Sequence, residues 1–344
     1  MERHKNKRGF KYHAAKGRHL KLNDLRIEAR ARGNNYLFKE NIPDYPRPEF
    51  HVCRLRHDTD IDGLEGIRGD GGFTNPWLKG LLWWSLDVGP EEIVSAERRL
   101  LETTYPDRTE EQIQKQQSLL SKFASSPVFQ SSSRLGPFRF TLTVEEIMRA
   151  YKEQFCGGAE PIMRVFQTHL YDQEVMYAVL VHSPGILEQL QYPLLTDDPD
   201  SVCCYRDGYF LWRSEAMCGK HSFELVHNDD LQQMEVNRGR GLSYVWDNVA
   251  IAFHVDNKVL KFDVDRLRKS LKFCEVKGVT IDRSTPFHDY EKADRIVRSL
   301  WPDYPAALER AGEQREDANE GHEEEGGAGG DLSDQLASLG LGSS

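Results

Sequence analysis

Residues 54–73 read Arg54-Leu-Arg-His-Asp-Thr-Asp-Ile-Asp-Gly-Leu-Glu-Gly-Ile-Arg-Gly-Asp-Gly-Gly-Phe73, and no other stretch says as much about the fold. The residues that lead into it, Phe50–Arg56, alternate between apolar and polar side chains, which indicates a β-strand. A short helix is expected over Gly63–Arg68, followed by a turn at Gly71-Gly72. The stretch therefore predicts a strand that carries His57 to a cleft, then a short helix that ends at a glycine.

A calcium-binding loop is the first alternative for this stretch. Asp58, Asp60, Asp62 and Gly63 match the pattern D-x-D-x-D-G. Position 12 of such a loop must supply a bidentate carboxylate because calcium takes six to eight oxygen ligands, and here that position is Gly69. The segment before the loop is also expected to be a strand instead of the helix that an EF-hand needs. We predict no metal site here.

The same residues resemble the first motif of the ADP-ribosyltransferase superfamily, in its poly(ADP-ribose) polymerase branch. In that family a strand ends in His-Gly-Ser/Thr, and an isoleucine follows ten residues after the histidine in a short helix that closes on a glycine. His57, Thr59, Ile67 and Gly71 fall in this register. The resemblance implies that His57 binds the adenosine ribose of NAD and that Thr59 binds the nicotinamide amide.

Two later segments are similar to the other blocks of that family. Residues 79–86, Lys-Gly-Leu-Leu-Trp-Trp-Ser-Leu, look like the second block, in which Trp83 or Trp84 would replace a stacking tyrosine. Residues 173–181 look like the third block, in which Glu174 would be the catalytic glutamate. Cleavage of the nicotinamide–ribose bond passes through an oxocarbenium-like state that a nearby carboxylate stabilises. NAD would then be a substrate.

The chain departs from the family pattern at two positions. Asp58 replaces the glycine whose backbone approaches the nicotinamide, and a carboxylate there would add bulk beside that site. The helix that should bear the stacking tyrosine offers Ile93, Ser95 and Ala96 instead. Structural roles are the alternative: His57 would then be an ordinary histidine at a strand end and Glu174 an exposed residue at a sheet edge.

Strand patterns dominate the middle of the chain, and helices are fewer. We expect strands over residues 81–88, 138–143, 161–168, 175–182, 204–212 (a hairpin turning at 206–208), 244–255 and 258–264, the last two pairing across 256–257. We expect helices over residues 20–32, 90–102, 109–123, 143–155, 265–274 and 288–301. Strand and helix do not alternate with βαβ spacing, so we predict an α+β fold with mainly antiparallel sheets and a few flanking helices.

Composition narrows the class of protein. The 344 residues carry a net charge of −10 and are 39% hydrophobic, which excludes a wholly disordered chain, a coiled coil and a collagen-like fibre. No apolar run reaches the roughly 20 residues that span a bilayer, and the N-terminus does not read as a secretory signal. The six cysteines form no CxxC pair and no zinc pattern, which favours reduced thiols in a cytoplasmic or nuclear protein.

Charge divides the chain into three predicted parts. Residues 1–44 are expected to be a flexible basic arm, since residues 1–34 carry a net charge of +8. Residues 45–305 are expected to form one α+β core domain. Residues 306–344, with a net charge of −8 and many Gly and Ser, are expected to be a disordered acidic tail. Only the basic arm could contact the phosphates of a nucleic acid.

Two functions follow from these observations. The resemblance implies an NAD-dependent ADP-ribosyltransferase-like protein that transfers ADP-ribose to a macromolecular acceptor such as a protein. The alternative is a catalytically inactive interaction or scaffold protein with charged recruiting tails. The two differ in geometry: an enzyme needs His57 and Glu174 to converge on one cleft with an aromatic wall, whereas a scaffold leaves them apart or fills the cleft with side chains.

Overall fold

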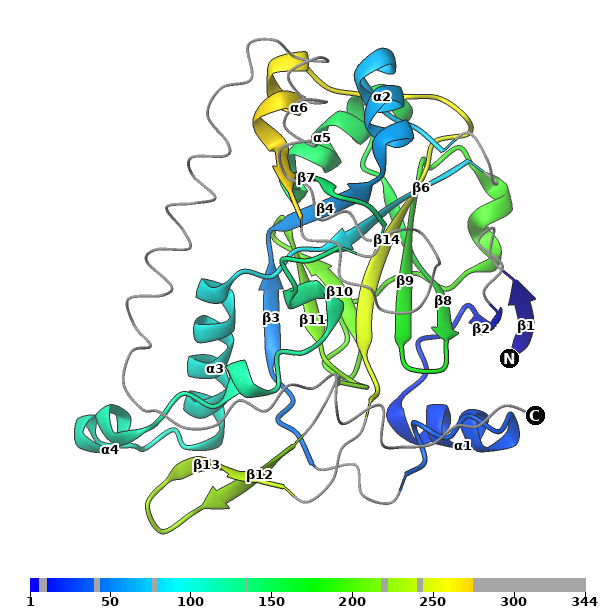
Figure 1. Cartoon of the computed structure of the whole chain (residues 1–344). Helices are drawn as coiled ribbons and strands as arrows, with labels where there is room; N and C mark the ends of the chain where they lie inside the picture. Colours follow the sequence, from blue (N-terminus) through cyan, green and yellow to red (C-terminus); the bar gives the residue numbers. More distant parts are fainter. Residues whose placement is uncertain are drawn as a thin grey trace, which may run out of the picture. The chain divides into compact units, whose positions relative to one another are not determined.

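The fold is a mixed α+β arrangement in which antiparallel sheets predominate and helices are few (Figure 1). A computed structural model describes residues 1–5, 11–39, 44–75, 80–133, 135–217, 222–239 and 244–274. Within these ranges the strands form one sheet of nine strands and three sheets of two or three strands. The predicted class, α+β with mainly antiparallel sheets, is confirmed at this level.

The main sheet contains the strands that carry the sequence motif. In chain order they are β1 (Glu2–Lys5), β2 (Lys11–Lys16), β4 (Arg54–Thr59), β6 (Leu81–Leu86), β7 (Phe138–Thr143), β8 (Ile162–Leu170), β9 (Val175–His182), β14 (Asp247–His254) and β16 (Leu271–Phe273). Their order in the sheet is β1–β2–β8–β9–β14–β6–β4–β7–β16. The central strands β9 and β14 are parallel to each other and almost wholly buried, which explains why they read as continuous apolar runs instead of alternating ones.

Three smaller sheets complete the β-structure of the described residues. They are β10 (Cys203–Arg206), β11 (Tyr209–Arg213) and β3 (Glu49–Val52); β12 (Phe223–Asn228) with β13 (Gln233–Arg238); and β5 (Gly72–Phe73) with β15 (Leu260–Lys261). The chain turns from β10 to β11 at Asp207 and Gly208, whose φ angles are 49° and 89°. Positive φ at both central residues is typical of a two-residue hairpin turn, so the predicted hairpin is confirmed.

Local sequence signals mark the ends of several helices. The α-helices are α1 (Leu22–Ala31), α2 (Ile61–Asp70), α3 (Pro90–Thr104), α4 (Glu110–Lys115), α5 (Val144–Phe155) and α6 (Val264–Ser270), and short 3₁₀ turns cover Leu120–Lys122, Pro127–Phe129 and Leu187–Gln191. The predicted capping box of α5 is formed, because Thr143 Oγ1 accepts from Glu146 N at 3.1 Å and Glu146 Oε2 accepts from Thr143 N at 2.9 Å. Helix α2 ends at Gly71 with a φ of 66°.

The basic N-terminal segment is part of the main sheet, which differs from the flexible arm expected over residues 1–44. β2 pairs with β8, and β1 pairs with β2. Ala14, Ala15 and Leu20 are buried, and Leu20 N donates to Thr168 Oγ1 at 2.9 Å. The segment has few apolar residues, but they fall where the strand meets the rest of the sheet.

Tertiary contacts also shorten one predicted helix. The helix expected over residues 109–123 ends at Lys115, because the side-chain amide of Gln116 donates to Met234 O at 2.8 Å and accepts from Met234 N at 3.1 Å. The amides of Leu119 and Leu120 then donate to a carboxylate oxygen of Glu97, at 2.8 and 2.6 Å. Both partners are distant in sequence, so local patterns do not reveal them.

Two further expectations near residue 260 are wrong in detail. The strand expected at 258–264 does not pair with β14; residues Leu260–Lys261 pair instead with β5. The helix expected at 265–274 stops at Ser270, because Leu271–Phe273 form a strand that pairs with β7 at the edge of the main sheet. The helix expected at 288–301 and the tail expected at 306–344 lie outside the described residues.

Candidate functional site

His57 lies near the end of β4 with its ring packed among aromatic side chains. Its ring centroid is 5.3 Å from that of Phe73 and 5.5 Å from that of Trp84. His57 Nδ1 lies 2.9 Å from Trp83 O, and since a carbonyl only accepts, Nδ1 carries the proton. Burial lowers the pKa of His57, so the ring is neutral at pH 7 and only Nε2 remains as an acceptor.

The two tryptophans proposed for an aromatic wall lie on opposite faces of the main sheet. Successive side chains of a strand point to opposite faces, and both residues lie inside β6. Trp84 shares the face of His57, whereas Trp83 contributes to a cluster with Phe166, their ring centroids 6.2 Å apart. Of the pair, only Trp84 can form a wall beside His57.

Asp58 is held in a buried ion pair and not beside the histidine. Arg139 Nε donates to Asp58 Oδ1 at 2.7 Å and Arg139 Nη2 donates to Asp58 Oδ2 at 2.9 Å, which is a bidentate contact. Burial alone would raise the pKa of Asp58, but hydrogen bonds and charge from Arg139 lower it overall. Strand alternation places this carboxylate on the face opposite His57, so the bulk expected beside a nicotinamide site is not there.

Thr59, the last residue of β4, lies buried under the first turn of α2. A Cβ added at Gly63 would collide with Thr59 Oγ1, so the helix passes directly over this side chain. Asp60 begins the helix, since its Oδ1 accepts from Gly63 N at 3.0 Å. The strand–helix–glycine unit predicted from the motif is therefore formed, with Thr59 packed inside it.

Glu174 is buried immediately before β9, far from His57. Its Oε1 accepts from Asn248 Nδ2 at 2.5 Å. One row of paired residues crosses β4, β6, β14 and β9, in which β4 carries His57 and β9 follows Glu174. The residues of this row are Arg56, Ser85, Ala250 and Ala178. His57 is thus level with Val179, five residues beyond Glu174 and three strands away, a separation of roughly 20 Å at the usual strand spacings.

The two residues also lie on opposite faces of the main sheet. Strand alternation places the side chain of Asn248 on the face of Ala250 and Ala252, and Ala252 pairs with Trp83. Because Glu174 is bonded to Asn248, its carboxylate belongs to the Trp83 face. The structure therefore brings His57, Thr59 and Trp84 together on one face and keeps Glu174 and Trp83 on the other.

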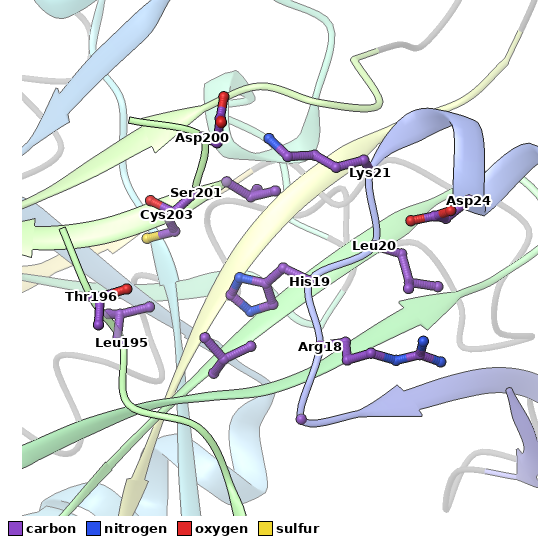
Figure 2. A pocket seen from close by; sticks show the side chains of 13 residues that line it. Arg18, His19, Leu20, Lys21, Asp24, Leu195, Thr196, Asp200, Ser201 and Cys203 are labelled. Carbon is purple, nitrogen blue, oxygen red and sulfur yellow. The ribbon is translucent and has the colours of Figure 1, made fainter. Parts of the chain in front are cut away.

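A pocket of about 340 Å³ lies elsewhere, between the segment that joins β2 to α1 and the segment that leads to β10. Figure 2 shows the imidazole of His19 between these segments and the side chain of Lys21 extending toward Asp200. His19 Nε2 donates to Ala178 O at 3.0 Å, which leaves Nδ1 as an acceptor in the neutral ring. Burial lowers the pKa of His19 to about 4.

This pocket mixes charges and hydrogen-bonding groups, so it can hold a small polar molecule. Its lining contains two basic residues, Arg18 and Lys21, and two acidic residues, Asp24 and Asp200. Sequence reasoning missed the pocket because residues 17–21 were assigned to a flexible arm. The available signal was Leu20, an apolar residue next to His19 that turns out to be buried.

The buried carboxylate of Asp247 is part of a hydrogen-bond network that includes Glu215 and the start of α1. Asp247 accepts from Ser214 Oγ at 3.1 Å and from Glu215 N at 3.0 Å. Glu215 in turn accepts from Leu22 N at 2.9 Å, which ties the start of α1 to the same group. Burial raises the pKa of Asp247 to about 6. The arrangement has a structural purpose that the sequence did not indicate.

Comparison with models of known protein families, with curated proteins and with solved structures found no match. None of the described helices is both long enough and apolar enough to cross a bilayer. A second pocket lies beside β1 and β2. Neither this pocket nor the His19 pocket is lined by the residues singled out from the sequence, which are His57, Thr59, Trp83, Trp84 and Glu174. Function therefore has to be argued from the geometry of the described residues.

Proposed function

We propose that this chain is a non-catalytic interaction protein in which the residues of the transferase-like motif stabilise the fold. The observation that carries the proposal is the position of His57 and Glu174, on opposite faces of the main sheet and three strands apart. One NAD molecule cannot be held by a histidine on one face while a carboxylate on the other face acts on its ribose. This separation of His57 and Glu174 supports the scaffold alternative over the enzyme.

The hydrogen bonds of these residues support the same conclusion. His57 Nδ1 is bonded to Trp83 O, Asp58 is paired with Arg139, and Glu174 is bonded to Asn248. Each polar group thereby avoids the cost of being buried without a partner. The half-buried imidazole of His57 also packs against the rings of Phe73 and Trp84.

Exposed apolar side chains favour a protein partner. Leu187, Leu190 and Leu194 expose 72%, 55% and 56% of their surface in the segment after β9. Leu187 and Leu190 are three residues apart in a 3₁₀ turn, so they project from the same side of it. Neighbouring apolar side chains left in water are typical of surfaces that another protein covers.

Calorimetric titration of the full chain with NAD tests the proposal. We expect no saturable heat up to millimolar NAD. Saturable binding that His57→Ala abolishes and His51→Ala retains would overturn it, since His51 lies on β3 in a different sheet. Circular dichroism on both variants establishes that each one is folded before its titration is interpreted.

An ADP-ribosyltransferase-like activity remains the second candidate, on the strength of one observation. β4, α2 and Gly71 form the strand–helix–glycine unit that the resemblance implies, and Nε2 of His57 is left as an acceptor. On this candidate the carboxylate would have to come from a residue other than Glu174. Release of nicotinamide from NAD by the wild-type chain, undiminished by Glu174→Gln, is the result that would favour it.

A further inference from the structure

Strand β1 forms one edge of the main sheet (Figure 1). It pairs with β2 on one side, and no described strand pairs with its other side. In an antiparallel pair, every second residue of a strand directs its N–H and C=O groups away from the partner strand. Beyond the ladder with β2, no backbone hydrogen bond engages residues 2–5 within the part of the chain that the structure describes. The outer edge of β1 therefore has free backbone groups to which another strand can be added.

This free edge carries cations on one of its two sides. Arg3 is paired with His13, and Lys5 with Lys11. Residues paired across antiparallel strands point to the same side, as do residues two apart on one strand. The exposed side chains of Arg3, Lys5 and Lys11 and the half-buried ring of His13 therefore share one side of the hairpin, which we call the basic side.

The charges of the basic side are not neutralised within the described part of the chain. No ion pair there engages Arg3, Lys5 or Lys11, whereas Glu2, on the opposite side of β1, lies 3.1 Å from Lys16. Lys5 and Lys11 face each other directly, which is an unfavourable arrangement for like charges. An acidic side chain placed beside them would relieve this repulsion.

The free edge and the cations together select the kind of partner. A second copy of β1 added edge to edge would bring Arg3 and Lys5 close to the same cations of the other copy, which opposes pairing. A nucleic acid or a membrane surface could meet the cations, but neither has a row of N–H and C=O groups at the spacing of a strand. An extended peptide with acidic residues at alternate positions satisfies both features, because its backbone pairs with β1 while its carboxylates lie on the basic side.

We propose that β1 binds an extended acidic segment of a partner protein as a further strand of the main sheet, with two carboxylates beside Arg3 and Lys5. The residue between these carboxylates then lies on the other side, next to His4, whose ring stacks on Tyr12 with centroids 5.4 Å apart. A β-branched residue suits that position. The inference rests on the proposed function, since it names a kind of partner, but its experiment uses no NAD, so either can fail without the other.

Fluorescence anisotropy of a labelled, end-blocked peptide, Thr-Glu-Val-Glu-Thr, titrated with the full chain tests this surface. The matched peptide has the same sequence with N-methyl groups on its three central residues, which keep the charges but remove the N–H donors. We expect saturable binding of the first peptide and at least about tenfold weaker binding of the second, because strand addition depends on main-chain hydrogen bonds. Slower amide hydrogen exchange in residues 2–5 on binding locates the contact.

The double variant Arg3→Glu/Lys5→Glu tests the charges. We expect its dissociation constant for the unmodified peptide to rise at least about tenfold, because two attractive cross-strand pairs become repulsive. Arg98→Glu/Lys115→Glu is the matched control, since it makes the same change of net charge at an exposed arginine of α3 and an exposed lysine of α4. It should change the affinity by less than about threefold, because salt screens distant surface charges. Circular dichroism establishes that both variants are folded.

Four results would each overturn the proposal. They are the absence of saturable binding of the unmodified peptide, equal binding of the N-methylated peptide, equal weakening by the control variant, and displacement of the peptide by an oligodeoxythymidine that binds as tightly or more tightly. The second and fourth results would mean that the cations attract anions without any addition of a strand.

Discussion

Asp58 occupies the position at which the ADP-ribosyltransferase motif has glycine, and its carboxylate forms an ion pair that joins neighbouring strands. It forms a bidentate pair with Arg139, which also donates to Gln130 O at 3.1 Å. Arg56 donates to the same carbonyl at 2.8 Å. Two arginines and one aspartate thus join β4, β7 and the loop before β7, so Asp58 stabilises the packing of these elements.

Replacing Asp58 with Asn should therefore destabilise the fold by about 3–5 kcal/mol, because it leaves the buried Arg139 charge uncompensated. The folded-state pKa of Asp58 is lowered, so its stabilisation is present above the unfolded pKa and is lost as the pH falls through the folded pKa. Urea unfolding at pH 7 and at pH 3 measures both effects. Asp197→Asn, in an exposed pair with Arg206, is the control and should change stability much less. Equal stability of Asp58→Asn and wild type at pH 7 would contradict this account.

Asp247 should have the opposite pH dependence. Its pKa is raised from 3.8 to about 6, so the folded chain holds the proton longer than the unfolded chain and stability falls as the pH rises from about 4 to 6. The Asp247→Asn side chain cannot ionise. As the pH rises over this interval, the free energy of unfolding of the variant should therefore increase by on the order of 3 kcal/mol relative to that of wild type. Chemical unfolding at several pH values measures the difference; parallel curves for the two proteins would contradict the expectation.

Among the elements, α5 was the helix best defined by its sequence. Thr143 and Glu146 satisfy each other's backbone amides, and the helix runs from Val144 to Phe155 as predicted. Thr143→Ala should cost about 1 kcal/mol of unfolding free energy, because it removes this cap. Thr103→Ala changes an exposed threonine in the last turn of α3. Its free energy of unfolding should stay within about 0.5 kcal/mol of the wild-type value. Thermal unfolding of the two variants side by side tests this, and a larger loss for Thr103→Ala would contradict it.

Elements were predictable where the determining signal lies within a few residues. The strands at 138–143 and 175–182 and the turn at Asp207 and Gly208 follow from apolar runs and turn chemistry. Elements that depend on distant partners were not predictable: Gln116 ends a helix by bonding Met234, and Leu271–Phe273 become a strand by pairing with β7. Local pattern carries no information on such partners.

Over the whole molecule, the N-terminal segment is the largest difference from expectation. A net charge of +8 over residues 1–34 suggested an arm, yet Ala14, Ala15 and Leu20 are buried against the sheet. Arg3, Lys5 and Lys11 are exposed, while Ala14 and Ala15 are buried in β2, the strand that pairs with β8. Composition averaged over a segment hides this division, and so it also hid His19 and its pocket.

Deleting residues 1–21 should therefore destabilise the protein. The deletion removes the strand pairing of β2 with β8 and the hydrogen bond from Tyr177 Oη to Leu20 O, 2.8 Å long. Lost hydrogen bonds and buried apolar groups together should cost at least about 3 kcal/mol, a fall of several degrees in Tm. Differential scanning calorimetry measures it. An unchanged Tm would mean that the segment is the flexible arm expected from the sequence.

The candidate site was predictable only in its local part. The order strand, helix, glycine around His57 lies within 20 residues and was found. The relation between His57 and Glu174 depends on the register of four strands and on the face that each side chain occupies, and chain separation alone does not determine either. Trp83 and Trp84 illustrate the same limit, since adjacent residues of a strand necessarily face opposite sides.

The central claim is that His57 and Glu174 belong to separate environments, and a double-mutant cycle tests it most directly. Free energies of unfolding would be measured for wild type, His57→Ala, Glu174→Ala and the double variant. Both single variants should lose stability, since each removes a bonded and packed side chain. The account predicts that the two losses add within about 0.5 kcal/mol, as for independent sites. A coupling of more than about 1 kcal/mol would place the two residues in one site and contradict the account.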